Sequence, residues 1–555
     1  MKKDLTMRKN TFVKGAFITT IGIVITKILG ILYVIPFHNI IGEKGGALYG
    51  YAYTIYTVFM SLSSAGIPLA ISKIVSEYQS LGYYNAKKRV FTLGKRIACF
   101  LGFVCFLILF FFAPILAKMV LGDVVGGNTI EDVTYVIRVI STAILIVPLL
   151  SIYRGYFEGH RFMSPPSISQ IIEQVVRVFI IIFGSFFALK FFHLSLTMSV
   201  GIALFGATLG AVISYFYLFY KRRKNKTKFN EKIRSVNEPI ISDKVIMKKI
   251  FIYAIPFIMI DIFKSIYNYV DMVTVVKGLV NVAGYQALEA EMIYGMLSTW
   301  AQKFNMIILA ISTGIVVSLI PTLTESMVKE NKDDIHKKIQ QALNILLYLT
   351  IPLTLGISFL AKPIWILFYG TSSYGPSVLS FYIFVGLFIG LFTSMVSTLQ
   401  TLKDYKAVFV SLLVGVIFKI LFNSKLLYAF HLMKFPAYYG VISTSIIGYF
   451  LSFICCLVFL KKKYDISFET TIMNFVDIMC GSILMIFILF VLRFVVPIYS
   501  DIRLLNILLI IFYGIIGMIV YFTYSHYVKL SGRVFGKDLL KKLGILFQKK
   551  RTKKM

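Results

Sequence analysis

Charged residues are scarce in this chain. Asp, Glu, Lys and Arg make up 15% of its 555 residues, against about 25% in a typical soluble domain. The five cysteines lie in apolar runs without a CxxC or metal-ligand spacing, so neither a disulfide framework nor a metal centre is predicted. No HExxH, Walker A, GxGxxG or GxSxG motif occurs, which argues against an ATPase motor and leaves no recognisable catalytic site.

Apolar residues are abundant instead, at 58% of the chain, and the mean hydropathy is +0.81. A chain this long and this apolar needs lipid as the solvent for much of its surface. Since a span takes about 20 apolar residues, the sequence predicts an all-α polytopic membrane protein with fourteen transmembrane helices. The expected spans are residues 12–37, 48–75, 96–121, 132–156, 165–189, 195–220, 249–276, 292–320, 339–361, 377–401, 406–424, 438–460, 472–494 and 502–527.

The net charge of +33 is distributed unevenly between the loops. With the N-terminus inside, the inside segments hold 42 Lys and Arg residues and the outside loops hold nine. This bias predicts cytoplasmic N- and C-termini and an even number of spans. The basic loop 221–249 and the basic tail are expected to face anionic lipid headgroups rather than nucleic acid.

The two halves of the chain show weak internal similarity. AGIPLAISKIVSE in the second span resembles VVSLIPTLTESMVKE in the eighth, and in both a Glu follows the Pro by nine residues. Such repeats predict two pseudo-symmetric six-helix lobes with a substrate path between them. The expected regions are an N-lobe at 1–222, a basic linker at 223–248, a C-lobe at 249–463, two extra helices at 464–528 and a basic tail at 529–555.

The seventh span carries a polar stripe. Asp261, Lys264, Asn268 and Asp271 recur at i, i+3, i+7 and i+10, on one helix face. A stripe of this kind is untenable against lipid, so it is expected to line the lobe interface. Two roles stay open for Asp261 and Lys264, mutual neutralisation or a part in the path. Asp271 has no basic neighbour on its own helix, which makes it a candidate cation or proton site together with Asp261.

Three lysines are candidates for binding an anionic substrate. Lys27 and Lys264 lie about fifteen residues into their predicted helices, too deep for simple snorkelling. With Lys303 they would offer ammonium donors to a phosphate. Glu173 and Arg177 stand at i, i+4 and are interpreted as a structural intramembrane pair.

Long stretches of the first half resemble a known family. ITKILGILYVIPFHNIIGEKGGALYGYAYTIY (25–56), SLSSAGIPLAISKIVSEY (61–78) and YRGYFEGHRFMSPPSISQIIEQVVRV (153–178) resemble the polysaccharide-flippase branch of the multidrug/oligosaccharidyl-lipid/polysaccharide exporter superfamily. Within that branch they are most similar to the lipid II flippases of Gram-positive bacteria and their sporulation relatives. The second half matches more loosely, through residues 294–323 and the polar seventh span.

The resemblance implies two lobes with alternating access, a cationic cavity, and a groove at helices 13 and 14 for the lipid tail. Lys27 stands where family members carry Arg, which keeps the charge and loses the bidentate fork. Lys303 falls near a second family Arg. Some relatives bind sodium between helices 7, 11 and 12, and Asp271 and Asn423 match two of those ligands. Leu427 stands where a further acid is expected.

The sequence therefore predicts a flippase, not an enzyme, in a bacterial cell membrane. Its expected substrate is lipid II, moved from the inner to the outer leaflet, with Lys27, Lys264 and Lys303 on the pyrophosphate. The alternatives are a flippase for another polysaccharide or teichoic-acid glycolipid, and a cation-coupled multidrug exporter. No cofactor is expected beyond a sodium ion, a proton or the membrane potential as coupling force. We expect a monomer among membrane lipids, with other cell-wall synthesis proteins as candidate partners.

Overall fold

The computed structural model describes residues 22–225 and 241–535, apart from residues 24 and 65, together with residues 229 and 239. Most of the predicted linker and tail, and the first part of the first span, lie outside these residues. The described chain is helical throughout, and its helices pack into two compact units. Unit 1 comprises residues 1–303 and 416–444, and unit 2 comprises residues 304–415 and 445–555.

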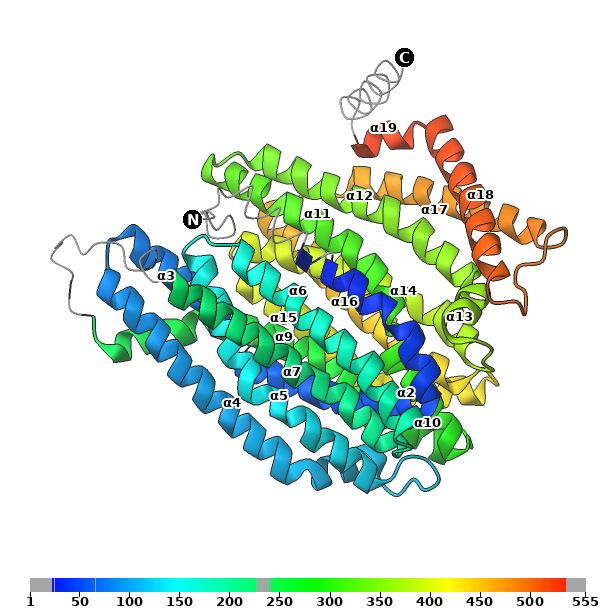
Figure 1. The fold of residues 1–555 in the computed structure, drawn as a ribbon. Helices are drawn as coiled ribbons and strands as arrows, with labels where there is room; N and C mark the ends of the chain where they lie inside the picture. Colours follow the sequence, from blue (N-terminus) through cyan, green and yellow to red (C-terminus); the bar gives the residue numbers. More distant parts are fainter. Residues whose placement is uncertain are drawn as a thin grey trace, which may run out of the picture. The chain divides into compact units, whose positions relative to one another are not determined.

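Unit 1 is built around α5, which packs against α2, α3, α4 and α7. Figure 1 shows α4, α5 and α7 running side by side. Pro68 stands in the first turn of α3, and Gly66 before it adopts a φ of 72°, so the chain breaks between α2 and α3. The helices of unit 1 are α2 (Val34–Ser64), α3 (Ile67–Ser80), α4 (Tyr84–Leu121), α5 (Ile130–Gly159), α6 (Ser164–Phe179), α7 (Leu196–Lys224), α9 (Asp243–Asn281) and α10 (Ala287–Gly295), with π-helical turns at Ile180–Gly184, Phe187–Phe191 and Met296–Trp300.

Unit 2 is built around α12, which packs against α14 and α17. Its helices are α12 (Lys332–Phe359), α13 (Ala361–Tyr369), α14 (Gly375–Thr401), α17 (Glu469–Leu492), α18 (Leu505–Tyr527) and α19 (Leu530–Phe535), with parts of α11 (Gln302–Val328), α15 (Tyr405–Leu432) and α16 (Ala437–Tyr464).

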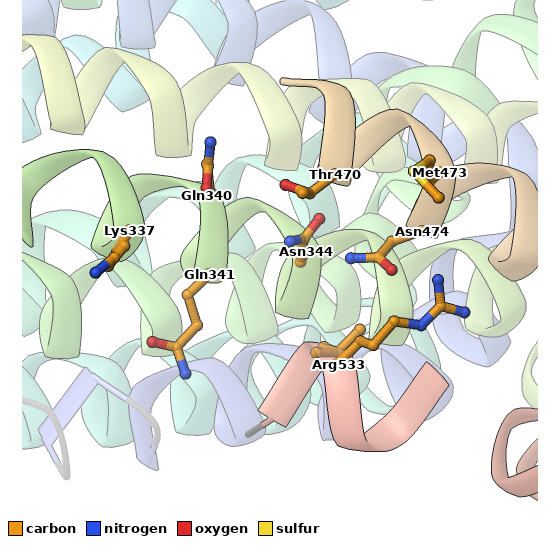
Figure 2. Close-up of a pocket in the computed structure, with 9 residues that line it drawn as sticks. Lys337, Gln340, Gln341, Asn344, Thr470, Met473, Asn474 and Arg533 are labelled. Atoms are coloured by element: carbon orange, nitrogen blue, oxygen red, sulfur yellow. The ribbon is translucent and has the colours of Figure 1, made fainter. Parts of the chain in front are cut away.

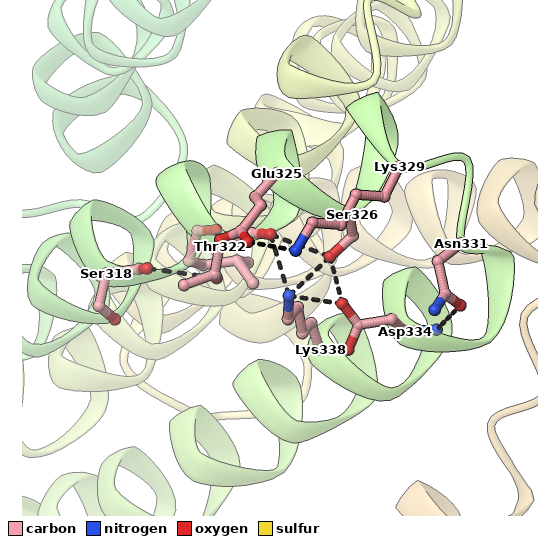
Figure 3. Close-up of polar contacts among 9 residues, drawn as sticks. Ser318, Thr322, Glu325, Ser326, Lys329, Asn331, Asp334 and Lys338 are labelled. Atoms are coloured by element: carbon pink, nitrogen blue, oxygen red, sulfur yellow. Dashed lines mark hydrogen bonds and ion pairs between the residues drawn. The ribbon is translucent and has the colours of Figure 1, made fainter.

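The turn from α11 to α12 is held by side chains (Figure 3). Lys338 forms an ion pair with Asp334 at 2.6 Å and donates to the Ser326 hydroxyl at 2.6 Å. Lys329 pairs with Glu325 at 2.6 Å on the exposed side of the same turn. These contacts fix the ends of the two helices without placing a charge deep inside unit 2.

Twelve helical segments of the described residues are long and apolar enough to cross a membrane. They do not include α9, which is long enough at 39 residues but carries the polar stripe. Nor do they include the first span, of which the described part starts at residue 22. Large apolar side chains face outward, such as Phe100 and Phe111 of α4, each 67% exposed. An apolar surface of this kind needs lipid around it, so the fold is that of a polytopic, all-helical membrane protein.

The two units do not follow the predicted lobe borders. Helices α9 and α10, predicted for the C-lobe at 249–463, pack in unit 1 against α2. The physical reason is close helix contact. A Cβ atom at Gly66 would lie 2.6 Å from the Ala254 carbonyl oxygen, so only glycine allows this approach. The lobe division itself concerns the internal repeat and stays a prediction.

Candidate functional site

Most of the charged side chains in the interior of the predicted spans lie in unit 1. The loops account for 51 of the 58 Lys and Arg residues, and the seven that remain all belong to that unit: Lys27, Lys73, Arg138, Arg177, Lys264, Lys303 and Lys419. Ionised groups at this depth are costly unless they are paired or face water. Their surroundings therefore indicate which of them are structural and which are available to a substrate.

Asp271 meets its basic partner on another helix. Its carboxylate lies 2.6 Å from the ammonium of Lys419, which is fully buried on α15. Lys419 also donates to the Val441 carbonyl and the Thr444 hydroxyl, both at 3.2 Å. The sequence left Lys419 without a role, and the two residues stand 148 positions apart, so no local pattern joins them.

Asn423 completes this cluster. Its amide nitrogen donates to Asp271 at 3.1 Å and to Thr274 at 2.7 Å. Its amide oxygen accepts from the Thr444 hydroxyl at 2.5 Å. The cluster therefore joins α9, α15 and α16 through one carboxylate, one ammonium, an amide and two hydroxyls.

The oxygens around Lys419 resemble a cation cage, but they do not fit a sodium ion beside that lysine. The ammonium already donates to the carboxylate, carbonyl and hydroxyl oxygens that an ion would need. Leu427, where a further acid was expected from the resemblance, is 1% exposed and packs near Gly278. A second cation next to a buried ammonium would meet like-charge repulsion in a low-dielectric setting.

Asp261 and Lys264 lie in a part of α9 whose side chains are more exposed than Asp271. Their charged atoms are 3.9 Å apart, at the edge of an ion pair, and the side chains are 48% and 38% exposed. Asp261 thus stands ten residues from Asp271 on the same helix, outside the Lys419 cluster. Lys264 is only loosely neutralised, which leaves it available to an anion.

Lys303, at the start of α11, contacts the helix that precedes Gly42. Its ammonium donates to the Tyr33 hydroxyl at 3.1 Å and lies 5.2 Å from the ring centroid. Lys27 is half-buried six residues before Tyr33, in the helical residues 25–32. A wall of tyrosines continues from Tyr33 along α2, where Tyr49 stacks on Tyr53 at 5.7 Å. Tyr33 and Tyr49 are buried, so the partly exposed Lys27 and Lys303 are the groups of this region that suit an anionic group.

Glu173 lies between two arginines. Arg177 pairs with it within α6 at 2.6 Å, and Arg154 of α5 pairs with it at 2.8 Å. Arg154 also donates to the Ser169 hydroxyl at 2.9 Å. The predicted pair of Glu173 and Arg177 did not include Arg154, which lies on another helix. With two arginines beside one carboxylate, the cluster keeps one net positive charge.

Contacts between early and late helices of unit 1 occur near both ends of α9. Towards its start, Lys249 pairs with Glu77 of α3 at 2.6 Å. Beyond its other end, Glu291 of α10 accepts from the Asn128 backbone at 2.8 Å and side chain at 2.7 Å. Between these ends, the hydroxyls of Ser61 and Ser265 are 3.3 Å apart. Within unit 1, α9 and α10 are thus joined to the N-terminal helices along their length.

Unit 2 holds a polar pocket of about 400 Å³ between α12, α17 and α19 (Figure 2). It is lined by amides such as Asn344 and Asn474, and by the cations Lys337 and Arg533. Arg533 is paired with Asp477, which offsets its charge. Among the described residues, no group of three or more His, Cys, Asp or Glu side chains could hold a metal ion here or elsewhere.

Comparisons with known proteins agree on the family. The model of the family described as polysaccharide biosynthesis protein matches residues 12–327. The chain is similar to the lipid II flippase MurJ of Bacillus subtilis, with 32% identity over 537 residues, covering 95% of this chain and 97% of that protein. It is also similar to stage V sporulation protein B of the same organism, with 25% identity over 61% of this chain and 63% of that protein.

Two solved structures share the fold. One is a lipid II flippase MurJ in an inward closed conformation, with a TM-score of 0.65, 15% identity, and coverage of 94% of this chain and 100% of that one. The other is an inward-facing multidrug transporter of the MATE family in the MOP superfamily, with a TM-score of 0.60 and 12% identity. That match covers 80% of this chain and 97% of the transporter.

Proposed function

Since this chain belongs to the polysaccharide biosynthesis protein family, we propose that it is a flippase that carries lipid II from the inner to the outer leaflet. The observation that carries the proposal is the 32% identity to a lipid II flippase over 95% of the chain. The partly exposed Lys27, Lys264 and Lys303 of unit 1 support an anionic substrate. A multidrug exporter of cationic compounds would be served better by an acidic cavity.

Lys303 and Lys27 hold the pyrophosphate in this proposal, and Lys264 joins them. The Tyr33 hydroxyl, which accepts from Lys303, keeps that ammonium directed without neutralising it. Two or three lysines are needed because a pyrophosphate brought into a low-dielectric cavity with a single counter-charge would be poorly compensated. The polyprenyl tail stays in lipid, and the sugar needs only a hydrated space.

Movement in this proposal is a rocking of the predicted lobes. The Lys249–Glu77 pair at one end of unit 1 and the Glu291–Asn128 contact at the other must open in turn. The first contact is one hydrogen-bonded ion pair and the second is two hydrogen bonds, between partly or wholly buried groups, and each bond is worth about 1–3 kcal/mol. Substrate binding can offset an energy of that size, which is the condition for alternating access.

Coupling in this proposal does not use sodium at the Asp271 cluster. The ammonium of Lys419 occupies the position that a bound cation would need, and it neutralises Asp271 in every step of the cycle. The membrane potential, acting on the charges of the substrate and of the lysines, is then the coupling force. Transport should be the same in sodium and in potassium buffers of equal ionic strength.

The test of the function is rescue of bacteria depleted of their own lipid II flippase. Expression of this chain should restore growth, and a Lys27→Ala, Lys303→Ala double variant should not, although it reaches the membrane. A matched control is Lys329→Ala, which removes an exposed cation of unit 2. Rescue of a strain that lacks a different glycolipid flippase, without rescue of the first, would reassign the substrate.

The orientation has its own test. After replacement of the five native cysteines, a cysteine in place of Val125, which is 90% exposed, should react with an impermeant thiol reagent in intact cells. One in place of Lys224, which is also exposed, should react only after the cells are opened. The opposite pattern would invert the assignment of the termini to the cytoplasm.

A further inference from the structure

We propose that unit 2 carries a separate lipid-binding site: a groove that accepts a phospholipid with a zwitterionic, amine-bearing headgroup. The groove has a volume of about 890 Å³ and is lined by residues of α12, α14, α16 and α17 and of the α16–α17 connection. It is independent of the proposed lipid II path, because every residue that lines it belongs to unit 2.

The walls of the groove are apolar along most of its length. Helix α12 contributes Leu343, Leu347, Ile351 and Leu355, which recur every four residues and so form one continuous stripe. Helices α14 and α16 add four apolar residues each, at i, i+3, i+4 and i+7. Three apolar helix faces that meet in this way give a surface suited to acyl chains rather than to a polar metabolite.

One end of the groove is charged, and the charges have both signs. Lys461 stands near the end of α16, Asp465 in the connection, and Glu469 at the start of α17, with Ser467 between the two acids. All four side chains are exposed. The nearby Lys463 is already paired with Asp404 at 2.7 Å, so its charge is partly offset. The groove mouth itself therefore offers one cation and two carboxylates.

This charge pattern distinguishes between headgroups. A phosphoethanolamine group can place its phosphate on Lys461 and its ammonium on Asp465 and Glu469. A phosphoglycerol group satisfies only the lysine and meets two carboxylates without a positive charge to offer. Exposed ion pairs of this kind are each worth about 0.2–1 kcal/mol, which corresponds to a selectivity of about threefold in favour of the amine-bearing lipid.

The groove also differs from the one expected at helices 13 and 14 for the polyprenyl tail. It is lined by the thirteenth span, α17, but by no residue of α18 among those the structure describes. Its mouth lies where α16 ends and α17 begins, at the side that the basic loops assign to the cytoplasm. The lipid it selects therefore belongs to the inner leaflet.

The experiment is native mass spectrometry of the full chain in detergent with equal amounts of phosphatidylethanolamine and phosphatidylglycerol of identical chains. The wild type should retain about threefold more of the ethanolamine lipid. Asp465→Asn combined with Glu469→Gln should lose this preference. The matched control is Glu330→Gln combined with Asp333→Asn, which removes two exposed carboxylates that do not line the groove. This control variant should keep the preference for the ethanolamine lipid.

A second pair of variants tests the groove itself. Ile454→Trp places an indole inside the groove and should lower the retention of both lipids. Ile511→Trp, on an exposed position of α18, should leave retention unchanged. Equal retention of the two lipids by the wild type, or equal retention by the two tryptophan variants, would overturn the proposal. Neither result bears on lipid II transport, which is measured separately.

Discussion

Unit 1 and unit 2 handle charge differently, although both are bundles of apolar helices. In unit 1, Glu173, Asp261, Asp271 and the partners Lys264 and Lys419 lie well inside their helices. In the described residues of unit 2, most charged side chains lie near helix ends or in loops, as at the α11–α12 turn (Figure 3), and Asp477, inside α17, is paired with Arg533. The interior of unit 2 uses hydroxyls and amides instead, such as Thr354.

The difference between the two units indicates which of them carries charged groups for transport. A charge at the centre of a membrane helix costs about 2.5–3.5 kcal/mol even on insertion scales, so a chain retains it where function requires it. Unit 1 retains several, and it also carries the contacts near both ends of α9. Unit 2 has the properties of a scaffold that meets lipid.

A cross-link inside unit 1 should stop transport completely. Ser61 and Ser265 face each other with hydroxyls 3.3 Å apart, so Ser61→Cys, Ser265→Cys in a chain without native cysteines should form a disulfide. Oxidation should abolish lipid II translocation, and a reductant should restore it. Each single cysteine variant serves as the control. Full activity of the oxidised protein would show that these helices need not separate.

Removal of the buried cation should destabilise unit 1 strongly. Lys419→Met leaves the Asp271 carboxylate without its counter-charge, which costs about 3–5 kcal/mol of unfolding free energy for a buried pair. Denaturant unfolding in detergent measures this loss. The double variant with Asp271→Asn should recover most of the stability, because no uncompensated ion remains. A double variant as unstable as the single one would contradict the pairing.

Loss of one of two partners should have a moderate effect. Arg154→Gln removes one charged hydrogen bond from Glu173 and leaves Arg177 in place. The expected cost is about 2 kcal/mol, the usual value for a hydrogen bond to a charged group. Arg138→Gln is the comparison variant, because Arg138 is exposed and, among the described residues, forms no ion pair with Glu173. Equal unfolding midpoints for the two variants would argue against the bridging role of Arg154.

Loss of an exposed pair in unit 2 should have no measurable effect. Lys329→Gln removes the partner of Glu325, and both side chains are more than 60% exposed. Solvent screens such pairs. Growth rescue and unfolding midpoint should equal those of the wild type. A clear loss of either would place function in unit 2 as well.

The fold follows from the sequence because span length and polar loops are local properties. Most helices of the described residues lie where the apolar runs predict them, and α9 extends the predicted seventh span to Asp243–Asn281, but α2 runs through the predicted loop after residue 37 and the predicted second span, 48–75, is broken between α2 and α3. The breaks were harder to predict. The kink at Gly42 and the π-helical turn at Met296–Trp300 depend on tertiary packing rather than on periodicity.

The site was predictable only in part, for the same reason. The i, i+4 spacing of Glu173 and Arg177 predicts a contact within one helix. The Asp271–Lys419 pair joins two helices that are far apart in the sequence, so no local spacing predicts it. A physical argument could still have found it. An acid and a base that each lack a partner on their own apolar helix need a counter-charge, and each is the other's obvious candidate.

Translocation in vesicles tests whether the cations of unit 1 carry an anionic lipid. Purified protein is reconstituted, and the movement of labelled lipid II between leaflets is followed. The wild type should translocate it, equally in sodium and potassium buffers. Lys27→Ala, Lys303→Ala should lose translocation, while Lys329→Ala, Lys362→Ala, with two cations of unit 2 removed, should keep it. Translocation by the first double variant at the wild-type rate would contradict the account.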